Sequence, residues 1–176
     1  MPETLIQPPR TLLEVWEGLP EGTLCQIIND KLIMSPAPII AHQMILNKIN
    51  IALLMFLIRN PLGEILISPV DVRFSKQNIL QPDILFIKNE NLDRIKKNNV
   101  FGAPDIVIEI LSPSTSHYDL EEKKLVYERH GVQEYFIVEP NAKSVMTYFL
   151  KDGIYEQQKS RNGRIKSAIL NTEILF

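Results

Sequence analysis

Apolar residues recur at helical spacing in the first half of the chain. Between positions 40 and 59 the residues that recur in this way are Ile45, Ile49, Ala52, Leu53 and Phe56. Such spacing places side chains on one face of a helix. Pro61 and Gly63 follow and favour termination. The sequence therefore predicts a long helix over 40–59.

Shorter runs of apolar and β-branched residues predict strands, because they are bounded by proline, glycine or polar turn residues. The predicted strands span 24–28, 32–34, 64–68, 70–74, 83–87, 105–111, 135–138, 145–150 and 154–158, and the last stretch of the chain favours a further edge strand. Asn29 and Asp30 suit the turn of a hairpin between the first two strands. Two shorter helices are predicted over 11–19 and 119–130, and a third short helix over 91–97.

The order of these elements predicts an α/β fold of mixed α+β type, with a twisted mixed sheet flanked by helices. The strand at 105–111, the helix at 119–130 and the strand at 135–138 favour a right-handed βαβ unit with two parallel strands. A chain of 176 residues fits one domain. Residues 1–10 contain adjacent prolines and no apolar cluster, so we expect a loose N-terminal arm.

Net charge, cysteine content and hydropathy limit the kinds of function that the chain can have. The net charge is −2, which argues against a strongly basic surface for nucleic acid but leaves room for a local basic cleft. Cys25 is the only cysteine, so neither an internal disulfide nor a cysteine-based zinc site can form, and a cytoplasmic location is favoured. The longest apolar run, 49–58, is too short to cross a membrane, so we expect no membrane partner.

Two acidic residues stand out against apolar surroundings. Glu109 lies inside the run Ile-Val-Ile-Glu-Ile-Leu, and Asp83 begins another apolar strand directly after Pro82. A lone buried carboxylate destabilises a fold by several kcal/mol unless it is paired or bound to a metal. Glu109 is therefore either a partner of a structural Lys or Arg, or one half of an acidic pair with Asp83. Such a pair suits Mg²⁺ or Mn²⁺.

Lys123 lies on the helix that follows Glu109. It is four residues after Asp119, so the two side chains share one face of the helix. The same helix carries many other charged residues, and a solvated surface helix is the alternative interpretation of Lys123.

A set of short motifs resembles one protein family. The motifs are Gln81-Pro82-Asp83, the segment 102–115 (GAPDIVIEILSPST), Asp119-Leu120, Glu122-Lys123, Tyr127-Glu128-Arg129, Gly131-Val132 and Glu134-Tyr135. In this order they resemble the Uma-type family of bacterial restriction-endonuclease-like proteins, which is placed in the PD-(D/E)xK nuclease superfamily. The likeness extends from Leu12 to the turn at Lys151-Asp152-Gly153.

This resemblance implies a restriction-endonuclease-like core and a set of site residues. Asp83 and Glu109 would be the two catalytic acids and, with the carbonyl of Ile110, would hold Mg²⁺ or Mn²⁺. The superfamily lysine normally follows the second acid by two residues, where this chain has Leu111; the family pattern moves it to Lys123. Asp71 and His42 match recurring family positions and would support the site.

The resemblance also implies a function: Mg-dependent endonuclease activity that hydrolyses phosphodiester bonds in DNA. One departure favours an alternative. The first hairpin carries Lys31 where relatives often have a glutamate, so a catalytically inactive nuclease fold that binds DNA or protein stays open. Cutting both strands of a duplex favours a homodimer.

Overall fold

A computed structural model describes residues 10–159 and 161–176 of the chain. The loose arm expected for residues 1–10 therefore lies outside the described residues, except for Arg10, which is exposed.

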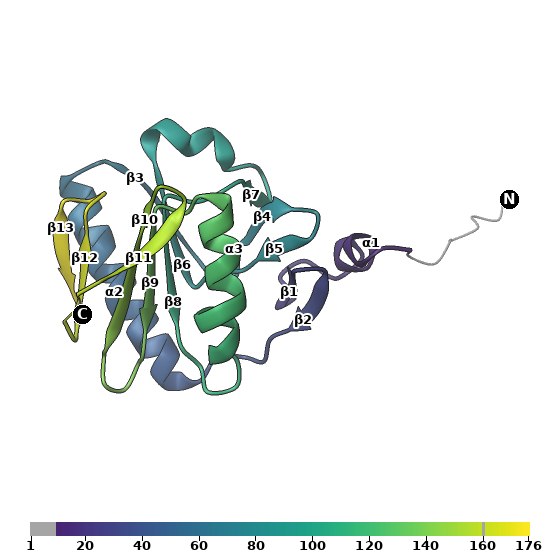
Figure 1. Cartoon of the computed structure of the whole chain (residues 1–176), viewed down its shortest axis with the longest axis horizontal. Coiled ribbons are helices and arrows are strands. Elements are labelled where there is room, and N and C mark those ends of the chain that lie inside the picture. The colour runs from purple at the N-terminus through teal and green to yellow at the C-terminus, as the bar shows by residue number, and fades with distance from the viewer. Residues whose placement is uncertain (1–9, 160) are drawn as a thin grey trace, which may run out of the picture.

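A six-stranded mixed sheet forms the centre of the molecule (Figure 1). Its strands, in spatial order, are β11 (Ile154–Gln158), β10 (Val145–Lys151), β9 (Glu134–Val138), β8 (Ile106–Ile110), β6 (Ile84–Lys88) and β3 (Gly63–Ile67). The pair β8–β9 is parallel and the other pairs are antiparallel. The predicted mixed sheet is confirmed, and so is the parallel pairing of the two strands that flank the helix predicted over 119–130.

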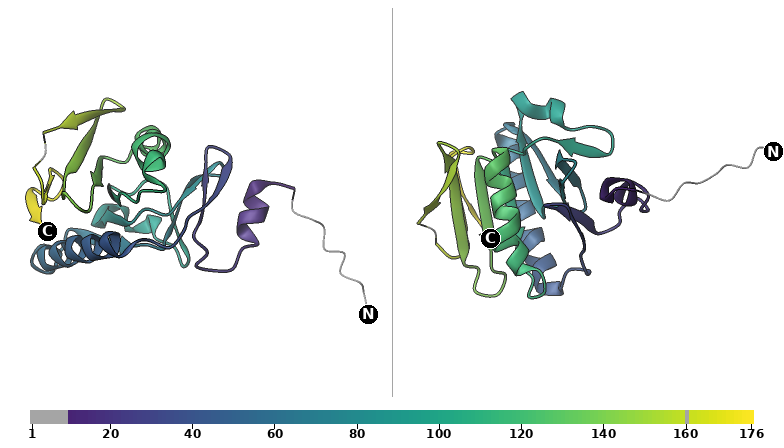
Figure 2. Two further views of the ribbon diagram at one scale, coloured as in Figure 1. Left: turned by 90° about the horizontal axis from the view of Figure 1, so that it is seen from below. Right: turned by 45° about the vertical axis from the view of Figure 1, so that its right-hand side comes forward.

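Two helices cover opposite faces of this sheet, as both views in Figure 2 show. Helix α2 (Ile40–Arg59) packs on the face formed by Ile84, Ile106 and Ile108, and α3 (Lys123–His130) packs on the face formed by Val107 and Tyr135. Because both faces are covered, every residue of β8 is buried. This double coverage explains the unbroken apolar run around Glu109.

A second sheet lies beside the first and consists of β2 (Lys31–Met34), β1 (Cys25–Ile28), β5 (Asn78–Leu80), β4 (Asp71–Ser75) and β7 (Asn99–Phe101). The sequence did not predict β5 or β7, which have only three residues each. The hairpin turn is confirmed: Asn29 and Asp30 have φ values of 48° and 59°, as a tight hairpin turn requires. Helix α1 (Leu12–Glu17) and a 3₁₀ helix, η1 (Asn89–Arg94), complete this part of the fold.

The C-terminal residues form a separate hairpin of β12 (Arg164–Ser167) and β13 (Thr172–Leu175). The further strand predicted for the last stretch is therefore confirmed, and it pairs within this separate two-stranded sheet. The carboxylate of Glu134 accepts hydrogen bonds from the Ser167 hydroxyl and from the N–H groups of Ala168 and Ile169. These bonds hold the hairpin turn at the start of β9, where Ile165 and Ile174 extend the core on the α2 side.

The helix predicted over 119–130 begins with a π-helical turn, η2 (Tyr118–Glu122), that continues directly into α3. Such turns often occur at functional sites. Here the π turn carries Asp119 into the interior, where 4% of the residue is exposed.

Helix α2 bears on the expectation that the protein has no membrane partner. Its 20 residues are long and apolar enough to cross a membrane, with a mean hydropathy of 1.4 over 18 residues, although the apolar run 49–58 alone is too short. Length and composition are weak evidence for a membrane span, because core helices pass the same test. One side of α2 is buried against the main sheet.

Candidate active site

Strand register brings the two predicted acids together. In the antiparallel pair β6–β8, Ile84 lies opposite Ile108. One further step along the same register places Asp83 opposite Glu109. Directly opposed residues point to the same face of a sheet. The two carboxylates therefore meet on one face, at the start of β6 and the end of β8.

Hydrogen bonds fix this arrangement. The N–H of Ile110 donates to Asp83 Oδ2 over 2.7 Å, and His42 Nε2, at the start of α2, lies 3.0 Å from the same oxygen. In return, the N–H of Asp83 donates to Glu109 Oε2 over 3.3 Å. Each carboxylate is thus bound to the backbone beside the other, which holds both side chains in place.

Lys123 enters the same site from α3. Its Nζ lies 3.0 Å from Glu109 Oε1 and 2.9 Å from Asp119 Oδ1. The hydroxyl of Tyr127, one helical turn later, donates to Glu109 Oε1 over 2.6 Å. Only 8% of the Lys123 side chain is exposed, so its interpretation as part of a solvated helix is wrong. The π turn and α3 together supply an acid, a cation and a hydroxyl to one point.

Acidic groups outnumber cations here. Burial, opposed by Lys123 and reinforced by Asp119 and Asp83, raises the pKa of Glu109 to about 8. Burial also raises the pKa of Asp119. Burial opposes the charge on Lys123, but the carboxylates of Asp119 and Glu109 outweigh it and raise its pKa. The site therefore holds a permanent cation together with acids that ionise reluctantly.

A cavity of about 90 Å³ opens onto these groups, enough for a small ion or a phosphate oxygen but not for a nucleotide. Its polar lining includes Gln26, Ser35, His42, Gln81, Ser112 and Thr115. Asp83 is the more accessible acid: 15% of its side chain is exposed, against 2% for Glu109.

The residues around this cavity fit a divalent cation. Across residues 10–159 and 161–176, no three His, Cys, Asp or Glu side chains converge as a preformed metal cluster. Mg²⁺, however, commonly binds through one or two carboxylates and keeps several waters. Asp83 and Glu109 supply such oxygen donors, and the positive charge of a bound cation would favour the ionised form of Glu109, whose pKa burial raises.

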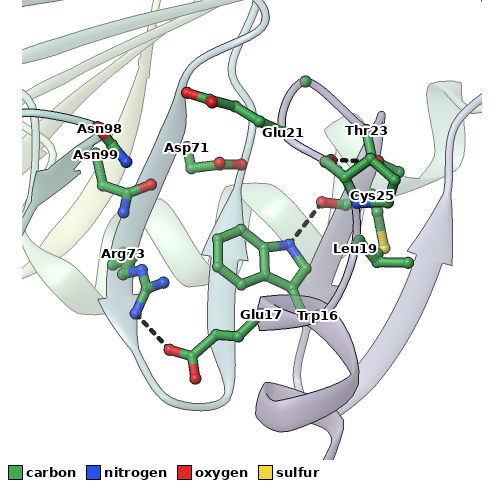
Figure 3. Close-up of a pocket in the computed structure, with 12 residues that line it drawn as sticks. Trp16, Glu17, Leu19, Glu21, Thr23, Cys25, Asp71, Arg73, Asn98 and Asn99 are labelled. Atoms are coloured by element: carbon green, nitrogen blue, oxygen red, sulfur yellow. Dashed lines mark hydrogen bonds and ion pairs between the residues drawn. The ribbon is translucent and has the colours of Figure 1, made fainter.

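Asp71, predicted to support the site, lines a different cavity of about 220 Å³ (Figure 3). Beside it, the Arg73 guanidinium lies 4.7 Å from the ring centre of Trp16 and pairs with Glu17 over 3.1 Å. Asp71 Oδ1 accepts a hydrogen bond from Gln81 Nε2 over 2.9 Å. Among the described residues, the hydrogen bond from Gln81, two residues before Asp83, is what connects Asp71 to the site.

Comparison with known proteins identifies the family. A family model, Uma2, described as "Putative restriction endonuclease", matches residues 12–172. The chain belongs to this family. A solved structure from Anabaena variabilis ATCC 29413, described as a putative nuclease belonging to DUF820, has a TM-score of 0.74 to this chain. It is 21% identical, and the match covers 93% of this chain and 92% of that chain. No curated protein matches the sequence.

Membership of the Uma2 family confirms the resemblance drawn from the motifs, and the solved structure confirms the restriction-endonuclease-like fold. Two residues of the site were not among the predicted ones. The sequence places Asp119 beside Lys123 on a helix and places both Asp119 and Tyr127 in the family motifs, but it assigns neither a role in the site. The i,i+4 spacings from Asp119 to Lys123 and from Lys123 to Tyr127 were the available signal, because both place the three residues on one helix face.

Proposed function

We propose that this Uma2-family protein is a divalent-metal-dependent endonuclease that hydrolyses phosphodiester bonds in DNA. The observation that supports this most strongly is the meeting of Asp83, Glu109 and Lys123 at one cavity, from three separate elements. Family membership supports nuclease activity in general. The choice of DNA, the ion and the roles of the residues are our proposals.

Asp83 and Glu109, with the carbonyl of Ile110, would hold Mg²⁺ or Mn²⁺. When bound, such an ion supplies a Lewis acid that polarises a phosphodiester oxygen. His42 is a positioning residue in this scheme. Its Nε2–H donates to Asp83 Oδ2, which also accepts from the N–H of Ile110. These two contacts fix the carboxylate and so orient its other oxygen.

Lys123 acts as a fixed positive charge rather than as a base. Its pKa is raised by Asp119 and Glu109, so it keeps its proton throughout the neutral range. A group that stays protonated cannot accept a proton from water, but it can stabilise negative charge that develops on the phosphate. Asp119 and Tyr127 position Lys123 and Glu109 for this task.

A cleavage assay tests the proposal. Supercoiled and linear duplex DNA would be incubated with Mg²⁺ or Mn²⁺ and with wild type, Asp83→Asn, Lys123→Met or Glu64→Gln. Loss of a preorganised charge typically slows catalysis by about 10²–10³. We expect losses of that order for the first two variants. Glu64→Gln changes an exposed residue of β3 and should cleave normally. Equal rates in wild type and Asp83→Asn would defeat the proposal.

The second candidate function is a binding module without catalysis. The burial of Glu109, whose pKa is raised to about 8, favours it, because a protonated carboxyl is a poor metal ligand. In that case the wild type would bind duplex DNA or a protein but would cleave no DNA with Mg²⁺ or Mn²⁺. Asp83→Asn would bind as well as the wild type does. The cleavage assay with a parallel DNA-binding measurement separates the two functions.

Three further proposals accompany the main one. We propose that the whole chain works as a single domain, since the site is built from α2, β6, β8 and α3. We propose a cytoplasmic location, where DNA is available and the buried thiol of Cys25 stays reduced. We also propose a homodimer, because cleavage of both strands is simplest with two sites.

A further inference from the structure

Helix α2 is apolar on two faces. The inner face packs against the main sheet through Ile45, Leu46, Ile49, Leu53 and Leu57. The outer face carries six large apolar residues whose exposed fractions range from 43% to 82%: Ile40, Met44, Ile51, Leu54, Met55 and Ile58. In the left view of Figure 2, α2 forms the lower edge of the molecule, and no other described element lies on its outer side.

The outer residues follow a regular spacing. Positions 40, 44, 47, 51, 54 and 58 alternate in steps of four and three, with Asn47 as the one polar member. We call these six positions, together with Met55, the outer seam. With 3.6 residues per turn, its centre lies about 180° around the helix from Ile49. The flanks between the two apolar faces are polar and include Gln43, Lys48 and Arg59.

We propose that the outer seam of α2 binds the outer seam of a second copy of this chain. Alternating steps of three and four are the pattern that packs two helices along their length. A single amide in such a seam restricts register. The pattern is self-complementary, as a twofold interface requires.

The area available fits a stable dimer. The six apolar residues, each 43% to 82% exposed, together present several hundred Å² of surface, comparable to the roughly 800 Å² that each partner buries in a specific interface. Exposed apolar patches of this size on soluble proteins usually mark interaction sites. The seam therefore supplies most of an interface without any rearrangement of the fold.

Charge favours a protein partner over a lipid surface. Helices that lie on membranes carry many Lys and Arg residues beside the apolar face. Helix α2 has only Lys48 and Arg59, and the whole chain carries a net charge of −2. Attraction to anionic lipid is therefore weak, while a second seam offers matched apolar area.

The proposed interface would also lie next to the candidate active site of each copy. Ile40 is two residues before His42, which contacts Asp83, so the seam starts beside the candidate site. Pairing through α2 would set the spacing between the two sites. The dimer itself does not depend on nuclease activity, and its test uses no DNA.

Sedimentation equilibrium of the full chain over a wide concentration range tests the inference. We expect wild type to show twice the 20.2 kDa monomer mass. Ile51→Lys should weaken the dimer by at least about a hundredfold, because twofold symmetry places two ammonium groups in one apolar seam. Ile154→Lys is the matched control: Ile154 is 65% exposed on β11, against 57% for Ile51, and its variant should remain dimeric.

Folding is checked separately by circular dichroism, and Ile58→Lys replaces Ile51→Lys if the latter fails to fold, since Ile58 is 82% exposed. A monomeric wild type at high concentration would overturn the inference, as would a seam variant that stays as dimeric as the control. Flotation with phosphatidylcholine vesicles covers the lipid alternative. Flotation of a monomeric wild type, lost in Ile51→Lys, would assign the seam to membranes instead.

Discussion

Replacing Glu109 by Gln should change how the stability of the protein depends on pH. Burial raises the pKa of Glu109 from its ordinary 4.5 to about 8, so the folded protein binds this proton more tightly than the unfolded chain does. Between these two values the folded state therefore carries more protons. The free energy of unfolding must then fall as pH rises through this window.

The size of the effect follows from the two pKa values. The gap from 4.5 to about 8, at about 1.4 kcal/mol per pH unit, sets a ceiling of about 5 kcal/mol. Asp119 competes for the same proton, because burial raises its pKa too. We therefore expect Glu109 to account for only part of this ceiling in the loss of unfolding free energy between pH ~5 and pH ~8.

Urea unfolding at several pH values measures this quantity. Wild type should lose stability as pH rises, whereas Glu109→Gln should follow a flatter curve, because the amide does not titrate and can still accept from Lys123 and Tyr127. Glu64→Gln, on an exposed position of β3, should run parallel to wild type. Parallel curves for wild type and Glu109→Gln would mean that Glu109 does not hold its proton in the fold.

Two other predictions concern the ion and the first hairpin. Mn²⁺ should raise the melting temperature of wild type but not of Asp83→Asn, because ligand binding stabilises the native state. The rise should be larger at pH ~8 than at pH ~5, because protons compete with the ion for the carboxylates. Equal shifts in both proteins would show that Asp83 does not bind the ion. Lys31→Ala should change the unfolding free energy by less than about 0.5 kcal/mol and leave DNA cleavage intact, because the Lys31 side chain is 67% exposed and only pairs with Glu122 at 3.6 Å. A tenfold loss of cleavage would instead make the first hairpin part of the site.

The long elements of the fold could be predicted because local pattern and tertiary burial agree in them. The bounds predicted for α2 match the structure, because the proline-containing segment 35–38 marks its start and Pro61 and Gly63 mark its end. Strands β5 and β7 escaped prediction because three residues carry too little periodicity, and β7 in addition pairs with β4, which lies well before it in the sequence. The place of the C-terminal hairpin could not be predicted either, because its position depends on Glu134, more than thirty residues earlier.

The residues of the candidate site were likewise predictable only in part. Asp83 and Glu109 were predictable because each interrupts or begins an apolar strand, where a charge needs a compensating partner. The separation of Asp71 from the site was not predictable from local pattern, because it depends on how β4 pairs in the second sheet. The role of Tyr127 was equally hidden, since a tyrosine on a helix face usually indicates packing, and only the position of α3 over β8 brings its hydroxyl to Glu109.

The sequence left two interpretations of Glu109, a structural ion pair or a catalytic acid, and the structure shows that the ion pair alone does not decide between them. Lys123 pairs with Glu109, as the first interpretation requires. A structural pair, however, needs one carboxylate for one ammonium, and here Asp119 and Asp83 add further acid around the same lysine. Each additional buried carboxylate destabilises the fold unless it is protonated or neutralised. Such an excess of buried acid is unfavourable for stability alone. A site for a divalent cation needs it, and this favours the catalytic interpretation.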